Sequence, residues 1–468
     1  MFLRYFYDEK LAQASYMVGC QKTGEAIIID PARDISPYVK TAEEQSFRIT
    51  GAAETHIHAD FVSGARELED AFKAKMYLSD EGDQEWKYEN LSGVNHQLLK
   101  DKDTFTVGNL LFEVIHTPGH TPESISYLLT DKGGGASEPI GIFTGDFVFA
   151  GDIGRPDLLE KAAGKQGTAE NGAKQMFQSL KKFKELPDYL QVWPGHGAGS
   201  ACGKSLGAVP STTAGYEKMV NWALNYESES DFTRALLEDQ PEPPVYFAEM
   251  KRVNKVGPAL LRTLSEVKLT GKSELEDEGI QIIDTRTSAE FAKGHLKGTI
   301  NIPFNQSFTN WAGWLIDYRK PMVFLTDMEN PSEITKALRS IGVDEVHGYG
   351  HAGDIVAKAS SLESYDEVSP KEIEQKVKEG SVHVLDVRSQ SEWQAGHIKG
   401  AQHIMLGTLP DRVNEVKDDK EVIVQCGSGM RSAIGVSVLQ AHGMKNVKNL
   451  TGGFTKWKKE TDSETIEK

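Results

Sequence analysis

Short runs of apolar and β-branched residues alternate with stretches of helical character in the second half of the chain. The runs at 281–284 and 422–425 are examples. Parallel strands are joined by such helical crossovers, so the alternation predicts mostly parallel sheets. In the first half, the apolar runs at 26–29 and 47–50 predict strands that lead into polar residues. The pattern as a whole predicts an α/β protein.

A repeat is visible within the second half, at a constant offset of 102 residues. That period is too long for one unit of a solenoid and indicates two copies of one α/β domain. The matched positions are Asp284, Arg286, Glu290, Gly294, His295 and Gly298 in the first copy, and Asp386, Arg388, Glu392, Gly396, His397 and Gly400 in the second.

The domain boundaries follow from length and from breaks in the pattern. A chain of 468 residues suggests about three domains of roughly 150 residues each. Prolines at 241, 243 and 244 interrupt helices and mark one boundary, and a second break lies at 360–370. We therefore expect domains at residues 1–240, including a linker helix, 241–364 and 365–468.

Composition narrows the possible partners. The formal charge of −17 disfavours nucleic acid and anionic membranes, and no run approaches the ~20 apolar residues of a membrane span. The N-terminal residues lack the features of an export signal. Three cysteines, an odd and small number, fit a reducing compartment better than a disulfide framework, so we expect a cytoplasmic protein.

One cysteine stands where an apolar run enters a glycine-rich turn. Cys426 follows residues 422–425 and precedes Gly427, Ser428, Gly429 and Met430. Arg431 stands five residues after the cysteine. Backbone N–H groups of such a turn, and the start of a following helix, stabilise a sulfur anion. A buried structural cysteine needs neither the glycines nor the arginine. The loop therefore predicts a nucleophilic thiol.

This segment resembles the active-site loop of rhodanese sulfurtransferases, and 385–401 and 450–457 resemble other landmarks of that family. The resemblance implies that Cys426 carries a persulfide, while Arg431 and the loop from Gly427 to Met430 bind anions. At the corresponding place in the first copy, residues 327–333 contain no cysteine, glycine or arginine. Since a carboxylate at Asp327 cannot carry sulfane sulfur, we expect a catalytically silent rhodanese-like domain there. Scaffolding, positioning and dimer contact all remain open as its role.

The first half carries potential metal ligands in four separate segments. They are Thr55-His56-Ile-His58-Ala-Asp60-Phe61, the turn at His120, the turn at Asp146 and the turn at His196. Glycines beside the last three let the backbone bend closely around an ion. Any one histidine alone would be an ordinary surface or core residue. Four such segments together predict a metal site.

These segments resemble the metallo-β-lactamase fold, an αββα sandwich with its metal at one edge, over roughly residues 1 to 230. Asp30 fits an early strand of that fold. Two-zinc hydrolases of the fold read His-x-His-x-Asp-His, and Phe61 occupies the last position here. Because an apolar ring removes a ligand from the second metal site, we expect one metal.

The motif with Phe61 resembles the persulfide dioxygenases of this superfamily. That resemblance implies mononuclear, non-haem Fe(II) held by His56, His120 and Asp146. Two histidines and a carboxylate with open positions suit such iron. The resemblance also places His58, Asp60 and His196 outside the ligand set, where they orient ligands or substrate.

Two further residues have alternative readings. Arg155 resembles an arginine that lies near the thiol substrate in that family and could hold a carboxylate or phosphate. A structural pair with Asp152 or Asp157 is the other reading. Cys202, six residues after His196, is either a redox-sensitive group near the metal or a packing residue.

The whole chain resembles bacterial sulfide-detoxification proteins that fuse a persulfide dioxygenase, a silent rhodanese-like domain and an active rhodanese. The resemblance implies that a low-molecular-weight thiol persulfide and O2 give sulfite and thiol at the iron site. Cys426 then combines sulfite with sulfane sulfur as thiosulfate. Glutathione, coenzyme A and bacillithiol remain candidate thiols. We also expect a homo-oligomer, either a dimer or a tetramer.

Two other functions remain open. One is a zinc thioester hydrolase resembling glyoxalase II, with an appended sulfurtransferase, against which Phe61 argues. The other is a sulfur-carrier or redox-sensing protein in which the metal domain is structural.

Overall fold

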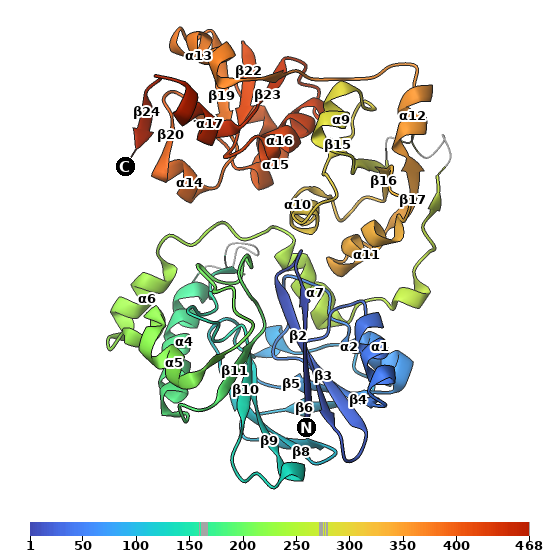
Figure 1. Ribbon diagram of the computed structural model, residues 1–468, viewed down its shortest axis with the longest axis vertical. Coiled ribbons are helices and arrows are strands. Elements are labelled where there is room, and N and C mark those ends of the chain that lie inside the picture. The colour runs from blue at the N-terminus through green and yellow to red at the C-terminus, as the bar shows by residue number, and fades with distance from the viewer. Residues whose placement is uncertain (159, 161–166, 271–274, 276, 278, 468) are drawn as a thin grey trace. The chain divides into compact units, whose positions relative to one another are not determined.

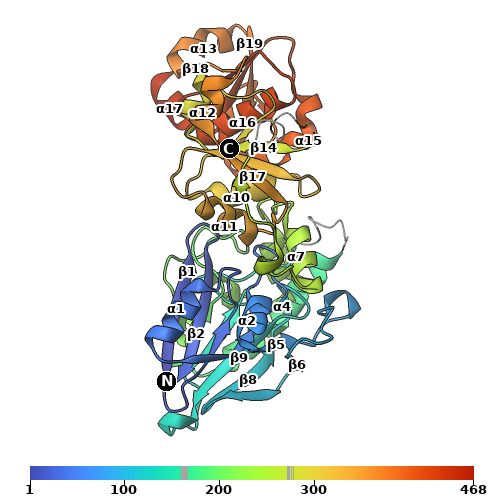
Figure 2. The ribbon, with the colours of Figure 1, turned by 90° about the vertical axis from the view of Figure 1, so that its right-hand side faces the viewer.

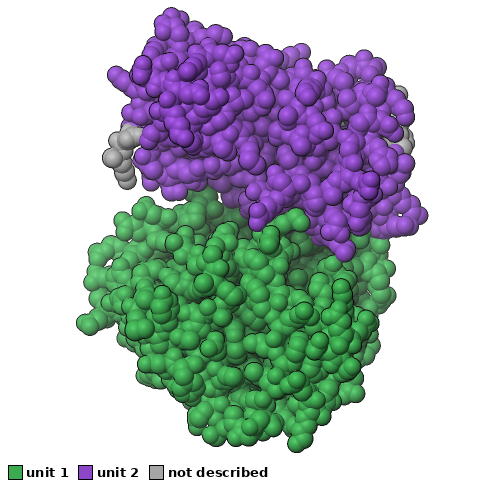
Figure 3. All heavy atoms as spheres, in the orientation of Figure 1, with its two compact units in different colours: residues 1–264, 339–342 green, residues 265–338, 343–468 purple. Residues whose placement is uncertain are grey.

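The computed structural model describes residues 1–158, 160, 167–270, 275, 277 and 279–467. Its contacts divide the chain into two compact units, which Figure 3 colours separately. The first unit comprises residues 1–264 and 339–342, and the second comprises 265–338 and 343–468. None of the helices within the described residues is long and apolar enough to cross a membrane.

Two sheets form the centre of the first unit. Their strand orders are β1-β2-β3-β4-β5-β6 and β12-β11-β10-β9-β8-β7. The strands are β1 (Phe2–Asp8), β2 (Gln13–Cys20), β3 (Glu25–Ile29), β4 (Arg48–Ala53), β5 (Lys75–Ser79), β6 (His96–Leu99), β7 (Thr104–Val107), β8 (Leu110–His116), β9 (Ile125–Asp131), β10 (Gly141–Gly145), β11 (Gln191–Pro194) and β12 (Thr212–Thr213).

Helices cover the outer face of each sheet, with α1 and α2 beside β3 and β4, and α4 and α5 beside β10 and β11 (Figures 1 and 2). The expected αββα sandwich is thereby confirmed. The helices of this unit are α1 (Ser36–Glu44), α2 (Ala65–Phe72), α4 (Thr168–Glu185), α5 (Ala214–Val220), α6 (Glu229–Leu237) and α7 (Phe247–Val256), with short 3₁₀ turns η1 (Gln84–Trp86), η2 (Lys132–Gly134), η3 (Trp222–Asn225) and η4 (Leu261–Thr263).

Strand β3 shows why the run at 26–29 is apolar without interruption. Ile27 and Ile29 belong to the core between the two sheets, whereas Ile28 belongs to the core under α1 and α2. Successive side chains of a strand point to opposite faces, so a strand covered on both sides must be apolar at every position.

The second unit contains the two copies expected from the repeat, each with its own sheet. The strand orders are β13-β17-β16-β14-β15 and β18-β23-β22-β19-β21. Every pairing in these two sheets is parallel, as predicted. A two-stranded antiparallel pair, β20 with β24, completes the second copy.

The strands of this unit are β13 (Lys268–Leu269), β14 (Gln281–Asp284), β15 (Ile300–Asn301), β16 (Met322–Thr326), β17 (Val346–His351), β18 (Glu367–Val368), β19 (Val382–Asp386), β20 (Gly396–Ile398), β21 (Gln402–His403), β22 (Glu421–Gln425), β23 (Val447–Leu450) and β24 (Thr465–Glu467). Its helices are α9 (Ser288–Lys293), α10 (Phe308–Leu315), α11 (Ser332–Ser340), α12 (Ala352–Lys358), α13 (Pro370–Lys378), α14 (Gln390–Ala395), α15 (Leu409–Arg412), α16 (Met430–Ala441) and α17 (Gly453–Glu460), with 3₁₀ turns η5 (Leu406–Thr408) and η6 (Val413–Glu415).

The repeated residues build the same local structure in both copies. In the first copy, the Arg286 guanidinium pairs with the buried carboxylate of Asp284 and donates to the carbonyl of Gly294. Arg388 does the same with Asp386 and the carbonyl of Gly396. A buried carboxylate without a partner is costly, so this pair explains why both residues recur.

The repeated histidines are structural as well. His295 donates from Nδ1 to the Phe291 carbonyl and stacks on that ring, with centroids 3.7 Å apart. His397 makes the same hydrogen bond and stacks on Trp393 at 3.5 Å. The landmarks that reveal the repeat therefore maintain the fold in both copies.

Candidate functional site

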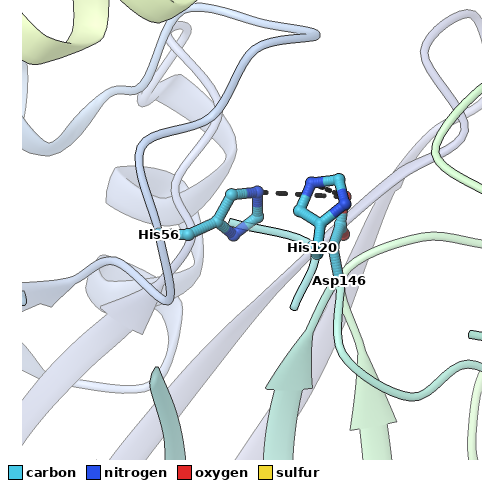
Figure 4. A group of neighbouring side chains, drawn as sticks. All are labelled: His56, His120 and Asp146. Atoms are coloured by element: carbon cyan, nitrogen blue, oxygen red, sulfur yellow. Dashed lines mark ion pairs between the residues drawn. The ribbon is translucent and has the colours of Figure 1, made fainter. Parts of the chain in front are cut away.

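Three of the predicted ligands converge at one edge of the sandwich (Figure 4). His56 follows β4, His120 lies between β8 and β9, and Asp146 directly follows β10. Oδ2 of Asp146 lies 3.8 Å from Nε2 of His56 and 3.4 Å from Nε2 of His120. All three side chains are buried, and one ligand atom from each lies within 4.8 Å of the others.

The other nitrogen of each imidazole is held by the protein. Nδ1 of His120 donates to the carbonyl oxygen of Arg155 at 2.9 Å. Nδ1 of His56 lies 3.0 Å from the hydroxyl of Thr55, which itself donates to Asp30. These bonds fix the ring orientations and leave each Nε2 lone pair facing Asp146, as in metal-binding histidines.

The three residues fit a cation. Nε2 of His56 and Oδ2 of Asp146 are buried without a hydrogen-bond partner among the described residues, an arrangement that proteins otherwise avoid. Burial, together with the neighbouring His58, lowers the pKa of His56 well below its usual value. Burial also lowers the pKa of His120. Both rings are therefore held in the neutral form that binds metal.

His58 lies in the same segment but is bound elsewhere. Its Nε2 lies 3.1 Å from Oδ1 of Asp30. Burial acts against the charged ring, but the carboxylate of Asp30 raises the pKa of His58 to about 9. A protonated imidazole paired with a carboxylate cannot be a metal ligand. The ring of Phe61, 1% exposed, packs against His58 with centroids 4.4 Å apart.

His196 connects two carboxylates. Its Nδ1 lies 2.7 Å from Asp146 and its Nε2 lies 2.6 Å from Asp60. Burial opposes protonation, but these carboxylates raise the pKa of His196 well above its usual value. The ring therefore orients Asp146 and leaves neither nitrogen free for a metal.

Cys202 lies beside this pair. Together with Asp60 and His196 it forms a second buried group of possible ligand atoms within 4.8 Å of one another. Burial, reinforced by the charges of Asp146 and Asp60, raises the pKa of Cys202 well above its usual value. The thiol form is favoured, and a thiol is a poor nucleophile and a poor ligand.

Arg155 is fully buried. Its guanidinium donates to both oxygens of Asp157, at 2.8 and 2.6 Å, and to the carbonyl of Pro241. Arg155 is thus paired with Asp157, as the structural alternative for this residue expects. The backbone carbonyl of the same residue orients His120, so the segment contributes to the metal site through its main chain.

Sequence reasoning missed two residues that hold the metal-binding segment. The amide of Asn254, in α7, donates to the carbonyls of His58 and Phe61 at 2.8 and 2.7 Å, and its Oδ1 accepts from the N–H of Ser63. Glu123 is fully buried and accepts from the N–H of Ile57 at 2.9 Å. Neither stands in a motif, and only its position in the fold reveals its role.

The cysteine loop has the predicted local structure. It joins β22 to α16, and Gly429, with φ of 101°, is the N-cap of that helix. Sγ of the buried Cys426 accepts a hydrogen bond from the N–H of Gly429 at 3.1 Å. The hydroxyl of Ser432, which sequence reasoning did not single out, lies 3.5 Å from the same sulfur.

The closing segment at 450–457 supports the loop from behind. The carbonyls of Cys426 and Gly427 accept from the N–H groups of Phe454 and Thr455. Gly453 has φ of 53°, and a Cβ there would lie 2.1 Å from the Cys426 carbonyl oxygen. Only glycine allows this close approach.

Arg431 is paired with Glu392. Its two terminal nitrogens each donate to a different carboxylate oxygen at 2.6 Å. Burial opposes ionisation, but the hydrogen bonds and charge of Arg431 lower the pKa of Glu392 to about 2. Each terminal nitrogen carries a second N–H, so the pair leaves donors for an anion. The anion-binding role of Arg431 stays a prediction.

Comparison with known proteins matches both halves to families. Residues 9–196 match the model of the metallo-beta-lactamase superfamily. The structure of a metallo-beta-lactamase from Staphylococcus aureus subsp. aureus COL is 46% identical, with a TM-score of 0.68, over 75% of this chain and 98% of that one. The chain belongs to the metallo-beta-lactamase superfamily. Residues 270–350 and 369–460 match the model of the rhodanese-like domain. This member of the superfamily therefore carries two rhodanese-like domains after its metallo-beta-lactamase domain.

Other members of the superfamily resemble the first half. A probable polyketide biosynthesis zinc-dependent hydrolase, PksB of Bacillus subtilis, is 30% identical over 182 residues, which are 39% of this chain and 71% of the relative. A hydroxyacylglutathione hydrolase of Rhodospirillum rubrum is 31% identical over 181 residues, which are 39% of this chain and 60% of the relative. The first half of the chain is thus similar in sequence to proteins named as hydrolases.

Asn254 provides a test of how the metal-binding segment is held. Replacing it with alanine removes three buried hydrogen bonds and leaves the His58 and Phe61 carbonyls unpaired. We expect Asn254→Ala to lower the free energy of unfolding by about 1–3 kcal/mol and to speed metal loss to a chelator. Urea unfolding and metal release measure these effects.

The matched control is Asn95→Ala, which removes an exposed amide bonded to the Lys73 carbonyl. Asn95→Ala should change neither the free energy of unfolding nor the rate of metal loss. Equal metal release from both variants would contradict the role assigned to Asn254.

The Glu392 pair predicts a pH dependence of stability. Because its pKa falls from 4.5 to about 2 in the folded chain, ionised Glu392 stabilises the fold above pH 4.5. That contribution is lost as the pH falls towards 2. We therefore expect the difference in melting temperature between the wild type and Glu392→Gln to be largest near neutral pH and to shrink on acidification.

Glu290 supplies the control, because it forms the same capping box in the first copy. Among the described residues no arginine donates a hydrogen bond to Glu290, and Arg286 acts on it only through its charge. The melting temperature of Glu290→Gln should therefore differ less from that of the wild type at neutral pH than the melting temperature of Glu392→Gln does. If both variants behave alike, the helix cap rather than Arg431 causes the effect.

Proposed function

We propose that the first domain is a persulfide dioxygenase and that the last domain is a thiosulfate-forming sulfurtransferase. The observation that carries this proposal is the ligand set of His56, His120 and Asp146. His58 and His196 are bound to carboxylates instead. The same chain carries the Cys426 loop.

The ligand set supports Fe(II). Two histidines and one carboxylate with open positions suit mononuclear iron that reacts with oxygen. A two-zinc hydrolase needs further ligands for its second ion, and Phe61 takes one of those positions. The side chains of all three ligands are buried, which keeps bulk water away from the site.

In the first reaction, a thiol persulfide, O2 and water give the free thiol, sulfite and two protons. Bound iron would supply the binding and activation of O2 and of the persulfide sulfur. The protein holds the ligand geometry: Thr55 and the Arg155 carbonyl fix the two imidazoles, and protonated His196 holds Asp146.

In the second reaction, the Cys426 thiolate attacks the outer sulfur of another persulfide. The S–S bond breaks, the thiol leaves with the proton, and Cys426 keeps the sulfane sulfur. Sulfite then attacks this sulfur and leaves as thiosulfate, which restores the thiolate. The Gly429 N–H is placed to stabilise negative charge on Sγ. The coupling consumes the sulfite that the first domain makes.

A zinc thioester hydrolase is the second candidate, favoured by the hydrolase relatives of the first domain. In that case zinc would replace iron and thioesters would be cleaved. The third candidate function is that of a sulfur carrier in which the metal domain is only structural. Oxygen uptake by the iron form separates the dioxygenase from the other two candidates, and thioester hydrolysis by the zinc form separates the hydrolase from the sulfur carrier.

Metal removal tests the first domain. We expect chelated protein to consume no oxygen with glutathione persulfide, and anaerobic reconstitution with Fe(II) to restore uptake at about one O2 per two persulfides, because the second persulfide is consumed at Cys426. An oxygen electrode and analysis of thiosulfate and sulfite measure this.

Zinc reconstitution is the control and should give no uptake. Thioester hydrolysis by the zinc form, with no oxygen uptake by the iron form, would replace the dioxygenase with the hydrolase.

Cys426→Ser tests the last domain. Because serine cannot carry sulfane sulfur, we expect the product to change from thiosulfate to sulfite, with oxygen uptake within about twofold of wild type. Ion chromatography quantifies both anions.

The matched control is Cys20→Ser, a cysteine of the core between the sheets. A folded Cys20→Ser chain should still make thiosulfate. An unchanged product ratio in Cys426→Ser would refute the assignment.

A further inference from the structure

The sulfur of Cys426 contacts a side chain as well as the backbone of its loop. Besides the N–H of Gly429, the hydroxyl of Ser432, in α16, lies 3.5 Å from Sγ. The same hydroxyl lies 2.6 Å from Oδ1 of Asn449, in β23. The side chains of Cys426, Ser432 and Asn449 are all buried. These three residues form a polar row that runs from the sulfur to the neighbouring strand.

The far end of the polar row fixes the orientation of the Asn449 amide. Nδ2 of Asn449 donates to the carboxylate of Glu367, in the edge strand β18, at 3.1 Å. An ionised carboxylate only accepts hydrogen bonds, so the amide nitrogen must face Glu367 and the amide oxygen must face Ser432. Oδ1 of Asn449 therefore meets the hydroxyl as an acceptor.

The single hydroxyl hydrogen of Ser432 lies between two acceptors. Two oxygens 2.6 Å apart need a hydrogen between them, and Oδ1 of Asn449 has none to give. The hydrogen therefore comes from Ser432, which turns a lone pair towards Sγ. That lone pair can accept from the S–H of a thiol, but it repels the negative charge of a thiolate. Asn449 thus determines which form of Cys426 the hydroxyl favours.

The charged groups near the sulfur stand outside the polar row. Burial opposes it, but the hydrogen bonds and charge of Glu392, together with the charge of a Cys426 thiolate, raise the pKa of Arg431. Arg431 therefore attracts the thiolate. The nearby carboxylate of Asp386 is neutralised by Arg388. None of these pairs changes when the Ser432 hydroxyl rotates.

The silent copy lacks the polar row. Leu269 pairs with Tyr349 there, as Glu367 pairs with Asn449 in the active domain. The pairings within the two sheets place Thr326, Tyr349 and Leu269 at the positions of Cys426, Asn449 and Glu367. Neither tyrosine nor leucine offers a side-chain amide or carboxylate. The residues that hold the hydroxyl are therefore present only where the cysteine is present.

We propose that the Ser432 hydroxyl is a switch, which donates to Asn449 while Cys426 is a thiol and turns to donate to Sγ when Cys426 is a thiolate. This rests on the proposed sulfurtransferase function, in which the thiolate returns each time sulfite takes the sulfane sulfur. At that step the S–S bond breaks and its electron pair stays on Sγ, so a second donor beside the Gly429 N–H stabilises the charge. Ser432 is then a catalytic residue, and Asn449 and Glu367 are positioning residues that orient its hydroxyl.

The test measures the ultraviolet absorbance of the Cys426 thiolate in the full chain, with Cys426→Ser as the baseline. We expect Asn449→Leu, which removes the competing acceptor, to raise the ratio of thiolate to thiol about tenfold at a fixed, mildly alkaline pH. In the Ser432→Ala background the same substitution should change nothing, because no hydroxyl is left to turn. Melting temperatures establish that each variant is folded.

A second variant leaves the buried residues unchanged. Glu367→Ala removes an exposed carboxylate and lets the amide turn its Nδ2 towards Ser432, so we expect the ratio to rise about threefold. The matched control is Asp366→Ala, which removes the same charge one residue away, from a carboxylate paired with Lys448. Asp366→Ala should leave the ratio nearly unchanged.

An unchanged ratio in Asn449→Leu would overturn the proposal, as would an equal rise with and without Ser432. So would a rise in Glu367→Ala no larger than that in Asp366→Ala. Failure of the proposed function itself looks different, because the unaltered chain would then form no thiosulfate from a thiol persulfide and sulfite, whatever its thiolate absorbance.

Discussion

The metal centre depends on the hydrogen bonds that the buried carboxylate of Asp30 makes. Asp30 follows β3 in the left-handed region, with φ of 49°, and it is 2% exposed. It accepts from the N–H and the hydroxyl of Thr55 and binds Nε2 of His58. A buried charge is tolerated only with such partners. The Thr55 hydroxyl that satisfies it also lies 3.0 Å from Nδ1 of His56, so Asp30 indirectly holds the ring whose Nε2 faces Asp146.

A second set of buried charges follows from the first. His58 is committed to Asp30, and His196 is committed to Asp60 and Asp146. The carboxylates therefore hold both histidines by hydrogen bonds and favour their protonated form. Gly145, with φ of 50°, lets β10 pass next to Thr55, where a Cβ would lie 2.2 Å from its hydroxyl. His56, His120 and Asp146 thereby remain grouped, with Nε2 of His56 and Oδ2 of Asp146 buried without a hydrogen-bond partner among the described residues.

The two rhodanese-like domains show what duplication kept and what it changed. The Asp–Arg pair, the stacked histidine and the capping glutamate recur, because each satisfies a buried or helix-terminal group. The cysteine loop does not recur. Leu325 pairs with Asp284 as Gln425 pairs with Asp386, so Thr326 stands at the position of Cys426, and the expectation that Asp327 takes that place was wrong by one residue. Glu392 has an added role, since this capping residue of the second copy also binds Arg431. The same scaffold therefore carries the cysteine loop in only one of the two copies.

The amino-acid sequence by itself predicted the sandwich, the repeat and the grouping of His56, His120 and Asp146, because strands, turns and ligand motifs are local patterns. It left open the role of Arg155, which proves to be buried against Asp157. It gave no sign of Asn254, which holds the His58 carbonyl from 196 residues away. Nor could it show that Asn449 binds the hydroxyl of Ser432. Hydrogen bonds between distant segments exist only once packing brings those segments together, so the tertiary structure alone decided them.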